Sequence, residues 1–206
     1  MEKGHRPVGE QALAQMAVQR SARVLDVGCG SGWASRLLAH QATDGYVIGI
    51  DISDQMVELA RTSSSSIRNL EFRVASAERL PFADNEFTHA FSMESLYYYQ
   101  NIPAALFEIH RVLVPRGVFV TVIDLFQENE ASHQWVEQLK VPVQLLGMPE
   151  YRSLLEGAGF VNVQDSRLYD PSPIPSEYSG SSFRSYDDYV SYRRAGSLFL
   201  RAEAGK

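Results

Sequence analysis

The sequence of 206 residues contains a single cysteine, Cys29, which excludes an internal disulfide and a zinc site built from several cysteines. It also has no long run of Lys or Arg, and its formal net charge is −6. Nonspecific nucleic-acid binding needs a cationic surface, so this charge argues against a nucleic-acid partner.

Long apolar segments are missing as well. The first ten residues, M-E-K-G-H-R-P-V-G-E, lack the apolar core of a signal peptide, and no segment approaches membrane-spanning length. With the lone cysteine, this predicts a cytoplasmic protein. Hydrophobic residues make up 45% of the chain and charged residues 21%, as in ordinary globular proteins. No internal repeat or linker divides the sequence, so we expect one domain over residues 1–206.

The most informative segment is V-L-D-V-G-C-G-S-G-W, residues 24–33, where an apolar strand pattern runs into Gly28, Gly30 and Gly32. Glycines at alternate positions let a strand turn sharply into a helix and leave no side chain between backbone and ligand. A dinucleotide fingerprint needs a third small residue where this chain has Trp33. The turn therefore predicts a nucleotide-like cofactor and argues against a nicotinamide-dependent oxidoreductase.

Two acidic residues narrow the choice of cofactor. Asp26 lies two residues before the first glycine, where a carboxylate repels a pyrophosphate but suits an ammonium or sulfonium group. Asp51 ends the next strand pattern, where an acid accepts hydrogen bonds from both ribose hydroxyls. An amino acid at one end and a ribose at the other describe S-adenosylmethionine (SAM).

The remaining periodicity alternates between strands and helices, which predicts a doubly wound, mostly parallel α/β sheet. Strands are expected at 23–26, 46–50, 70–74, 87–92, 118–125, 161–168 and 197–202. Helices are expected at 11–20, 31–40, 54–62, 103–113 and 149–158. Ser53 is the expected N-cap of the third helix, with Met56, Leu59 and Ala60 on its inner face.

Two segments fall outside this alternation, residues 127–148 and residues 170–194. The second is rich in Pro, Ser and Tyr. Long insertions in compact α/β domains are usually lids or functional loops, so both are candidate lid segments. For the tyrosines of the second segment, surface packing of an extended loop is the favoured interpretation.

Four linked segments carry a resemblance to a known family: V-L-D-V-G-C-G-S-G, V-I-G-I-D-I-S, A-E-R-L-P-F and R-V-L-V-P-R-G. In this order and spacing the chain resembles the class I SAM-dependent methyltransferases, in particular the branch of the ubiquinone and menaquinone biosynthesis methyltransferases (type 11). The resemblance is strong over residues 23–126 and weaker over 150–163. It implies a seven-stranded Rossmann-like sheet with an antiparallel last strand, and SAM as cofactor.

Through the resemblance, further residues become candidates for cofactor binding. The segment S-A-E-R-L-P-F resembles the one that holds the adenine, although Ser76 replaces the Asp of many relatives. Ser92 ends the strand whose main chain meets the methionine part of the cofactor in related enzymes. The expected cofactor-binding residues are Asp26, Gly28, Cys29 (through its backbone), Gly30, Gly32, Asp51, Ile52, Met56, Ala77, Glu78 and Ser92.

On the acceptor side the chain departs from the family, because Leu96-Tyr97-Tyr98 stands where relatives often have Leu-His-His. Phenols do not titrate near neutral pH, so this change argues against a histidine base at that place. The candidates for a catalytic role are Glu94, Tyr97 and His133. The five histidines show no metal-ligand spacing, so we expect no metal site.

These observations predict a SAM-dependent methyltransferase that acts on a small molecule, as a monomer or homodimer. The sulfonium already activates the methyl group, so the enzyme mainly has to align the acceptor with the S–CH₃ bond. The acceptor atom (O, N, C or S) is left open. The alternative is a non-catalytic SAM-binding regulator or subunit with the same fold.

Overall fold

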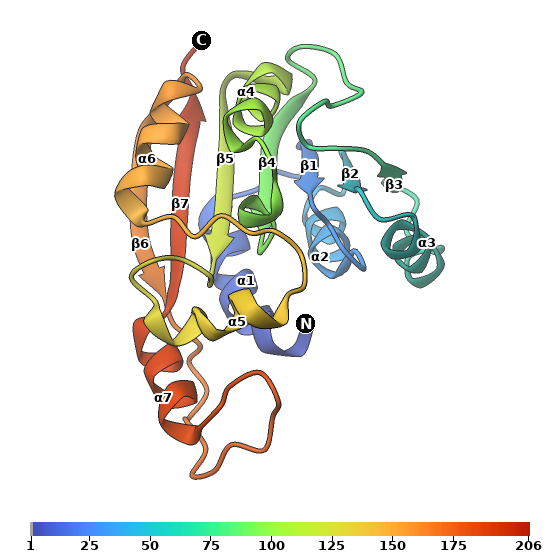
Figure 1. Cartoon of the computed structure of the whole chain (residues 1–206). Coiled ribbons are helices and arrows are strands. Elements are labelled where there is room, and N and C mark those ends of the chain that lie inside the picture. Colours follow the sequence, from blue (N-terminus) through green and yellow to red (C-terminus); the bar gives the residue numbers. More distant parts are fainter. Residues whose placement is uncertain (1) are drawn as a thin grey trace.

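Seven strands form the centre of the computed structural model, which describes residues 2–206 and their side chains from Gly4 onward (Figure 1). The sheet order is β3-β2-β1-β4-β5-β7-β6, and β7 is antiparallel to both of its neighbours. The strands are β1 (Arg23–Val27), β2 (Tyr46–Asp51), β3 (Leu70–Val74), β4 (Phe87–Met93), β5 (Leu113–Ile123), β6 (Phe160–Leu168) and β7 (Ser197–Ala204). The predicted seven-stranded, doubly wound sheet is confirmed.

Helices cover both faces of this sheet, as parallel βαβ connections require. Side chains of α1 and α2 pack into one buried cluster, and those of α4 and α6 pack into another. The helical segments are α1 (Glu2–Met16), α2 (Trp33–Gln41), α3 (Asp54–Ser63), η1 (Leu96–Tyr98), α4 (Ile102–Val112), η2 (Glu130–Ser132), α5 (Gln134–Gln138), α6 (Met148–Gly157) and α7 (Tyr186–Ala195). Two apolar layers therefore hold the central strands in place.

Strand β5 begins five residues earlier than predicted. Leu113 already pairs with Phe87, and the register then shifts before Val118 pairs with His89. The backbone turns within the strand at Arg116–Gly117, since Arg116 has a φ of 62°. The additional residues of β5 form an irregularity within the strand, so they do not make a separate loop between α4 and β5.

Helix α3 confirms one prediction and corrects another. The hydroxyl of Ser53 accepts a hydrogen bond from the Met56 N–H at 3.3 Å, so Ser53 is the N-cap. The inner face consists of Val57 and Ala60, whereas Leu59 is 48% exposed. Placing Leu59 on the inner face was wrong, because Val57 lies between the positions that were chosen and takes the centre of the apolar stripe.

The first helix covers residues 2–16 rather than the predicted 11–20. Its buried side chains, Val8, Ala12, Leu13 and Met16, recur at helical spacing against the sheet. The helix ends at Met16, because the next residue, Ala17, has a left-handed φ of 54°. Pro7 masked the earlier start in the sequence, because a proline inside a helix normally interrupts it.

The two segments outside the alternation are more ordered than their sequences suggested. Residues 127–148 contain η2 and α5, and residues 170–194 contain most of α7. Both α5 and α7 lie beyond the carboxyl ends of the parallel strands, on the side where the N-terminal end of α1 also lies (Figure 1). Within the part of the chain that the structure describes, no helix combines the length and apolarity needed to cross a membrane.

Candidate functional site

The glycine turn after β1 is left-handed at all three glycines, with φ of 77°, 51° and 76° at Gly28, Gly30 and Gly32. The three positions favour glycine for different reasons. A Cβ on Gly28 would lie 2.5 Å from the Ser95 side chain, and one on Gly32 would lie 2.5 Å from the Phe72 ring. A Cβ on Gly30 would meet nothing within 4 Å. Two of the glycines therefore let the protein pack against itself, and only Gly30 opens onto free space.

Asp51 lies at the carboxyl end of β2, directly across from this turn. Its two carboxylate oxygens accept hydrogen bonds from the N–H groups of Gly30 and Ser53, each at 2.9 Å. Each oxygen keeps a second lone pair, so two ribose hydroxyls can still be accommodated. The next residue, Ile52, is 77% exposed, and Met56 is partly buried beside it on α3. An exposed apolar side chain at this place suits a flat adenine ring.

Asp26 is buried inside β1, with 2% of its surface exposed. It accepts a hydrogen bond of 2.5 Å from the Ser35 hydroxyl of α2. Burial raises the pKa of Asp26 to about 7, and the charge of Asp51 adds to the rise against the lowering effect of Ser35. A carboxyl with this pKa gains a proton in mildly acidic solution unless a cation lies beside it.

The Cys29 side chain is buried. Its thiol packs beneath the turn with Val57, Ala60 and Phe72. Burial raises the pKa of Cys29 far above its ordinary value, and the charges of Asp26 and Asp51 add to this effect. The side chain is thus a structural thiol, and only the backbone of Cys29 faces the turn.

The segment after β3 supplies the other candidate adenine contacts. Ala77 is buried, and the Glu78 carboxylate accepts a hydrogen bond from the Asn101 N–H at 3.0 Å. The Ser76 hydroxyl accepts one from the Glu78 N–H, so it shapes the turn in place of the charged residue of many relatives. Leu80 is 4% exposed and packs in the main core.

Strand β4 ends next to the glycine turn. The hydroxyls of Ser92 and Ser95 lie 2.5 Å apart, and the Ser95 hydroxyl donates to the Val27 carbonyl. Between these serines stands Glu94, in a left-handed conformation with a φ of 54°. A left-handed backbone is uncommon for a non-glycine residue, and such residues are frequent at functional sites.

The Glu94 carboxylate is held by two donors. The Asp124 N–H donates to one oxygen at 2.5 Å, and the Tyr97 hydroxyl donates to the other at 3.0 Å. Burial and the neighbouring charge of Asp124 raise the pKa of Glu94 to about 8. The fold thus brings together two of the predicted catalytic candidates, Glu94 and Tyr97.

The structure adds two residues that the sequence analysis missed, Asp124 and His5. Asp124 follows β5 and is 1% exposed, and its Oδ2 lies 3.0 Å from the Nδ1 of His5 in α1. The Tyr192 hydroxyl of α7 donates to the same oxygen at 2.7 Å. The nearest atoms of His5, Glu94 and Asp124 all lie within 4.8 Å of one another. No sequence motif connects three residues so distant along the chain.

The third catalytic candidate, His133, lies in the segment between β5 and α6. Its Nε2 is 3.3 Å from the carbonyl of Phe126 and 3.1 Å from that of Gln127. The structure does not bring His133 into a hydrogen bond with Glu94 or Tyr97, and within the described residues its imidazole bonds to the loop backbone. One nitrogen of the imidazole is therefore occupied by the loop that follows β5.

The two candidate lid segments contact the site and each other. The Gln144 N–H donates to the Tyr97 carbonyl, and the Gln144 side chain donates to the Tyr99 carbonyl. The indole of Trp135 donates to the Ser182 carbonyl at 2.7 Å. Five aromatic rings then form one cluster over the end of β5, joining α5 to α7: Trp135, Tyr178, Phe183, Tyr189 and Tyr192.

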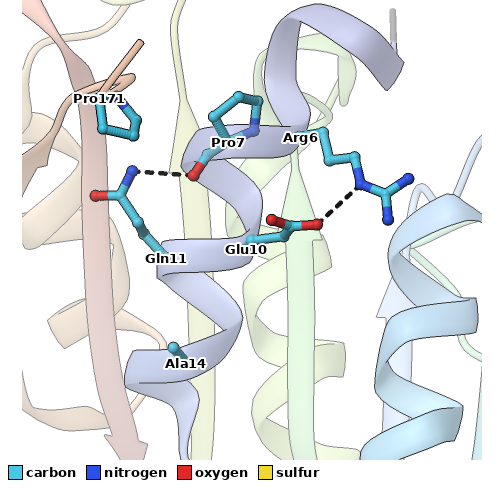
Figure 2. Close-up of a pocket in the computed structure, with 6 residues that line it drawn as sticks. All are labelled: Arg6, Pro7, Glu10, Gln11, Ala14 and Pro171. Carbon is cyan, nitrogen blue, oxygen red and sulfur yellow. Dashed lines mark hydrogen bonds and ion pairs between the residues drawn. The ribbon is translucent and has the colours of Figure 1, made fainter.

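A hollow of about 600 Å³ lies away from these residues, on the outer side of α1. Figure 2 shows its lining, with Arg6 paired to Glu10 and the Gln11 amide directed at the Pro7 carbonyl. No carboxyl or imidazole of the candidate site reaches it. The Gln11 amide also donates to the Tyr169 carbonyl, and this hydrogen bond connects α1 to the end of β6.

The fold and site together define a class of protein. A seven-stranded sheet of this order, a glycine turn with one open position and an acid at the end of β2 are the features of a Rossmann-like domain for an adenosyl cofactor. The buried acid in β1 suits a cationic cofactor. The residues present therefore fit SAM better than a dinucleotide.

Comparisons with known proteins agree with this class. A family described as "Methyltransferase domain" matches residues 25–121. An O-methyltransferase, rstn1, of Aspergillus nomiae is 31% identical over 185 residues, covering 86% of this chain and 79% of that protein. The demethylmenaquinone methyltransferase of Staphylococcus aureus is 27% identical over 186 residues, covering 78% and 76%.

A solved structure is similar over the whole chain. It belongs to the complex between the Haloferax volcanii Trm112 methyltransferase activator and a methyltransferase. The identity is 31%, the TM-score is 0.92, and the match covers 100% of this chain and 92% of that one. The chain belongs to the class I SAM-dependent methyltransferases, in the type 11 branch that includes the menaquinone methyltransferases. It is a SAM-dependent methyltransferase.

Proposed function

We propose that this methyltransferase binds SAM across the carboxyl ends of β1 and β2. The ribose lies on Asp51, and the amino acid end lies near Asp26 and the open space above Gly30. The adenine lies against Ile52 and Met56. The remaining proposed contacts are those predicted from the sequence: Gly28, Cys29, Gly32, Ala77, Glu78 and Ser92.

We propose further that the acceptor is a small molecule held at the carboxyl ends of β4 and β5. The observation that carries this proposal is the pair of carboxyl groups on Glu94 and Asp124, which meet beside the cofactor turn beneath α5 and α7. Ligands of open α/β sheets gather outside the carboxyl ends of the strands. Holding an acceptor in line with the S–CH₃ bond supplies most of the rate enhancement, since the methyl group is already activated.

The segments 127–148 and 170–194 are the proposed lid of a single domain over residues 1–206. Their aromatic cluster stands above the end of β5, and Gln144 binds them to η1. A lid in this place excludes water from the transfer, which strengthens the electrostatic contacts inside. It also limits the acceptor to a molecule that fits beneath it.

Two measurements test the proposed function. Calorimetry measures SAM binding, and a screen of small-molecule fractions with methyl-labelled SAM measures transfer of the label. Transfer to a small molecule supports the proposal. SAM binding without transfer to any small molecule contradicts it and favours the non-catalytic SAM-binding protein.

A second candidate concerns the partner. The similar Haloferax volcanii structure comes from a complex with the activator Trm112, and its match covers this whole chain. We propose as the alternative that the chain works together with an activator protein. Repeating the label screen with and without an added Trm112-type protein tests this, because activity that depends on the added protein supports the alternative.

The pKa of Asp26 predicts how SAM binding depends on pH. Binding of a cation requires the ionised carboxylate, so we expect SAM affinity to fall as the pH decreases through about 7. Calorimetry across neutral pH measures this. Asp26→Asn should bind SAM weakly at every pH, and a flat pH profile in the wild-type protein contradicts the role given to Asp26.

The same pKa predicts the stability of the cofactor-free protein. The folded-state pKa of Asp26 is raised above its ordinary value of 3.8, so the folded protein binds this proton more tightly than the unfolded chain. The contribution of Asp26 to stability is present below pH 3.8 and decreases as the pH rises towards about 7. We expect bound SAM to reduce this loss of stability. Thermal melts with and without SAM measure the difference.

Tyr97 and His133 border the proposed acceptor site without contacting the proposed cofactor site. We expect Tyr97→Phe, which removes the donor to Glu94, and His133→Ala to impair transfer while SAM affinity stays within about threefold, or roughly 0.7 kcal/mol. Tyr46→Phe, at the opposite end of the sheet, is the matched control. If both variants transfer methyl at the wild-type rate, the acceptor site lies elsewhere.

A further inference from the structure

His5 connects the N-terminal helix to the carboxyl end of β5, although 119 residues separate it from Asp124 in the sequence. Its Nδ1 lies 3.0 Å from the Asp124 carboxylate, and the Asp124 side chain is only 2% exposed. An ionised carboxylate accepts hydrogen bonds only, so the imidazole nitrogen that faces it carries the proton. The other nitrogen, Nε2, is then left with a free lone pair.

That second nitrogen is accessible. The His5 side chain keeps 21% of its surface exposed, and its Nε2 makes no hydrogen bond within the described part of the chain. One edge of the ring is thus fixed by a buried acid, and the other edge is open. This is the arrangement in which a carboxylate orients a histidine base and stabilises its protonated form.

Helix α1 is held firmly enough to place this ring. A Cβ on Gly9 would lie 2.4 Å from the Trp33 ring and 3.0 Å from the Met93 sulfur, so α1 touches α2 and the end of β4 at van der Waals distance. The Gln11 amide connects the other side of the helix to the Tyr169 carbonyl through a hydrogen bond. His5 projects from the same helix one turn before Gly9, so its position follows from these contacts.

The charged and titratable groups around His5 come from three neighbouring elements. Burial lowers the pKa of His5, but the hydrogen bond to Asp124 and the charges of Glu94 and Asp124 outweigh it, so the pKa lies above 6.5. Tyr192 of α7 and Tyr97 of η1 donate to the two carboxylates. Both phenols remain protonated, since burial raises the pKa of each well above its ordinary value.

The dyad lies next to the proposed cofactor site. Asp124 donates its N–H to Glu94, and Ser95, the residue after Glu94, contacts Gly28 of the turn. On the other side, Tyr192 places the dyad beside the aromatic cluster, with ring centres 5.3 Å from Trp135 and 4.9 Å from Phe183. An acceptor between the cofactor and these rings therefore meets both aromatic surface and a basic nitrogen.

We propose that His5, oriented by Asp124, is the general base for methyl transfer to the hydroxyl group of an aromatic molecule; this rests on the proposed function. The acceptor oxygen attacks the methyl carbon of SAM as its proton passes to Nε2 of His5. The C–S bond breaks, its electron pair stays on sulfur, and S-adenosylhomocysteine leaves. The resulting imidazolium is paired with Asp124 and later loses its proton to solvent.

Acceptor acidity makes this proposal testable before the natural acceptor is known. The probes are phenol, which is protonated near neutral pH, and 4-nitrophenol, which is largely ionised in mildly alkaline buffer and needs no base. His5→Asn keeps an N–H donor for Asp124 but has no basic nitrogen. We expect it to lower kcat for phenol by about 10²–10⁴-fold, to affect 4-nitrophenol far less, and to leave KM and SAM affinity nearly unchanged.

Two further readouts separate a base from a structural tether. Added imidazole should restore phenol methylation in His5→Ala, and wild-type kcat should rise with pH through a value above 6.5, a rise that His5→Asn lacks. His40→Asn, which changes an exposed histidine of α2, is the matched control and should behave as wild type. Thermal melts of each variant verify folding.

Several results overturn the proposal. The proposal is wrong if His5→Asn methylates phenol at the wild-type rate. It is also wrong if His5→Asn loses activity on phenol and on 4-nitrophenol equally, since an equal loss marks a structural role. Loss of transfer on adding a chelator, with recovery on adding Mg²⁺ or Mn²⁺, means that His5, Glu94 and Asp124 bind a metal instead. If the wild-type protein methylates other small molecules but neither phenol, His5 is not the proposed base and the proposed function still holds. If it methylates no small molecule, the proposed function itself is wrong.

Discussion

Replacing Asp51 by Ala should raise the dissociation constant of SAM by about 30- to 900-fold, equivalent to roughly 2–4 kcal/mol. The reason is the loss of two charge-assisted hydrogen bonds from the ribose hydroxyls. Asp51 is the one acidic side chain in the described structure that joins the glycine turn to the N-terminus of α3, through Gly30 and Ser53. Calorimetry with SAM and with S-adenosylhomocysteine measures the effect.

The same two backbone contacts mean that Asp51→Ala also loosens the cofactor-free turn. We therefore expect a lower melting temperature, and binding must be measured well below it. Asp54→Ala is the matched control, because it removes an exposed carboxylate three residues further on without touching the turn. Unchanged SAM affinity in folded Asp51→Ala would show that the ribose does not lie on this acid.

Replacing Gly30 by Val should abolish SAM binding while the sheet stays folded. The new side chain points into the space above the turn, where no protein atom lies within 4 Å. The φ of 51° adds strain of about 1–2 kcal/mol for a residue with a Cβ. Circular dichroism should show a retained fold, and calorimetry should show no binding.

The neighbouring glycines make this experiment specific. Gly28→Val and Gly32→Val drive a side chain into Ser95 and Phe72, so both should destabilise the fold itself. Gly157→Val, at the end of α6, adds the same side chain in open space far from the turn and serves as control. If Gly30→Val binds SAM normally, the open side of the turn does not face the cofactor.

The order of strands and helices was predictable because each signal is local. Strands 23–26, 46–50 and 70–74 agree with β1, β2 and β3 to within one residue. The N-cap at Ser53 followed from one side chain and the residue three positions later. Parallel pairing then followed from the alternation alone, since short connections through helices allow little else.

The local signals were weaker where a helix depends on packing. Helix α7 has no fully buried side chain within the described structure, although Tyr192 is partly buried, and its sequence of Tyr, Asp and Ser suggests a loop. Its tyrosines pack against Tyr178 and Phe183 of the preceding loop and against Trp135 of α5, more than fifty residues before Tyr192. Contacts between distant segments produce no hydrophobic periodicity in the sequence of either segment.

The sequence by itself determined the glycine turn after β1, the positions of the acids Asp26 and Asp51, and the family. These residues lie within one βαβ unit, so their spacing is fixed by covalent geometry. Only the tertiary structure decided that Gly28 and Gly32 serve packing while Gly30 opens outward, and that His5 meets Asp124 beside Glu94. The physical reason is that the carboxyl ends of β4 and β5 and the start of α1 become neighbours only once the sheet has formed and α1 has packed across it.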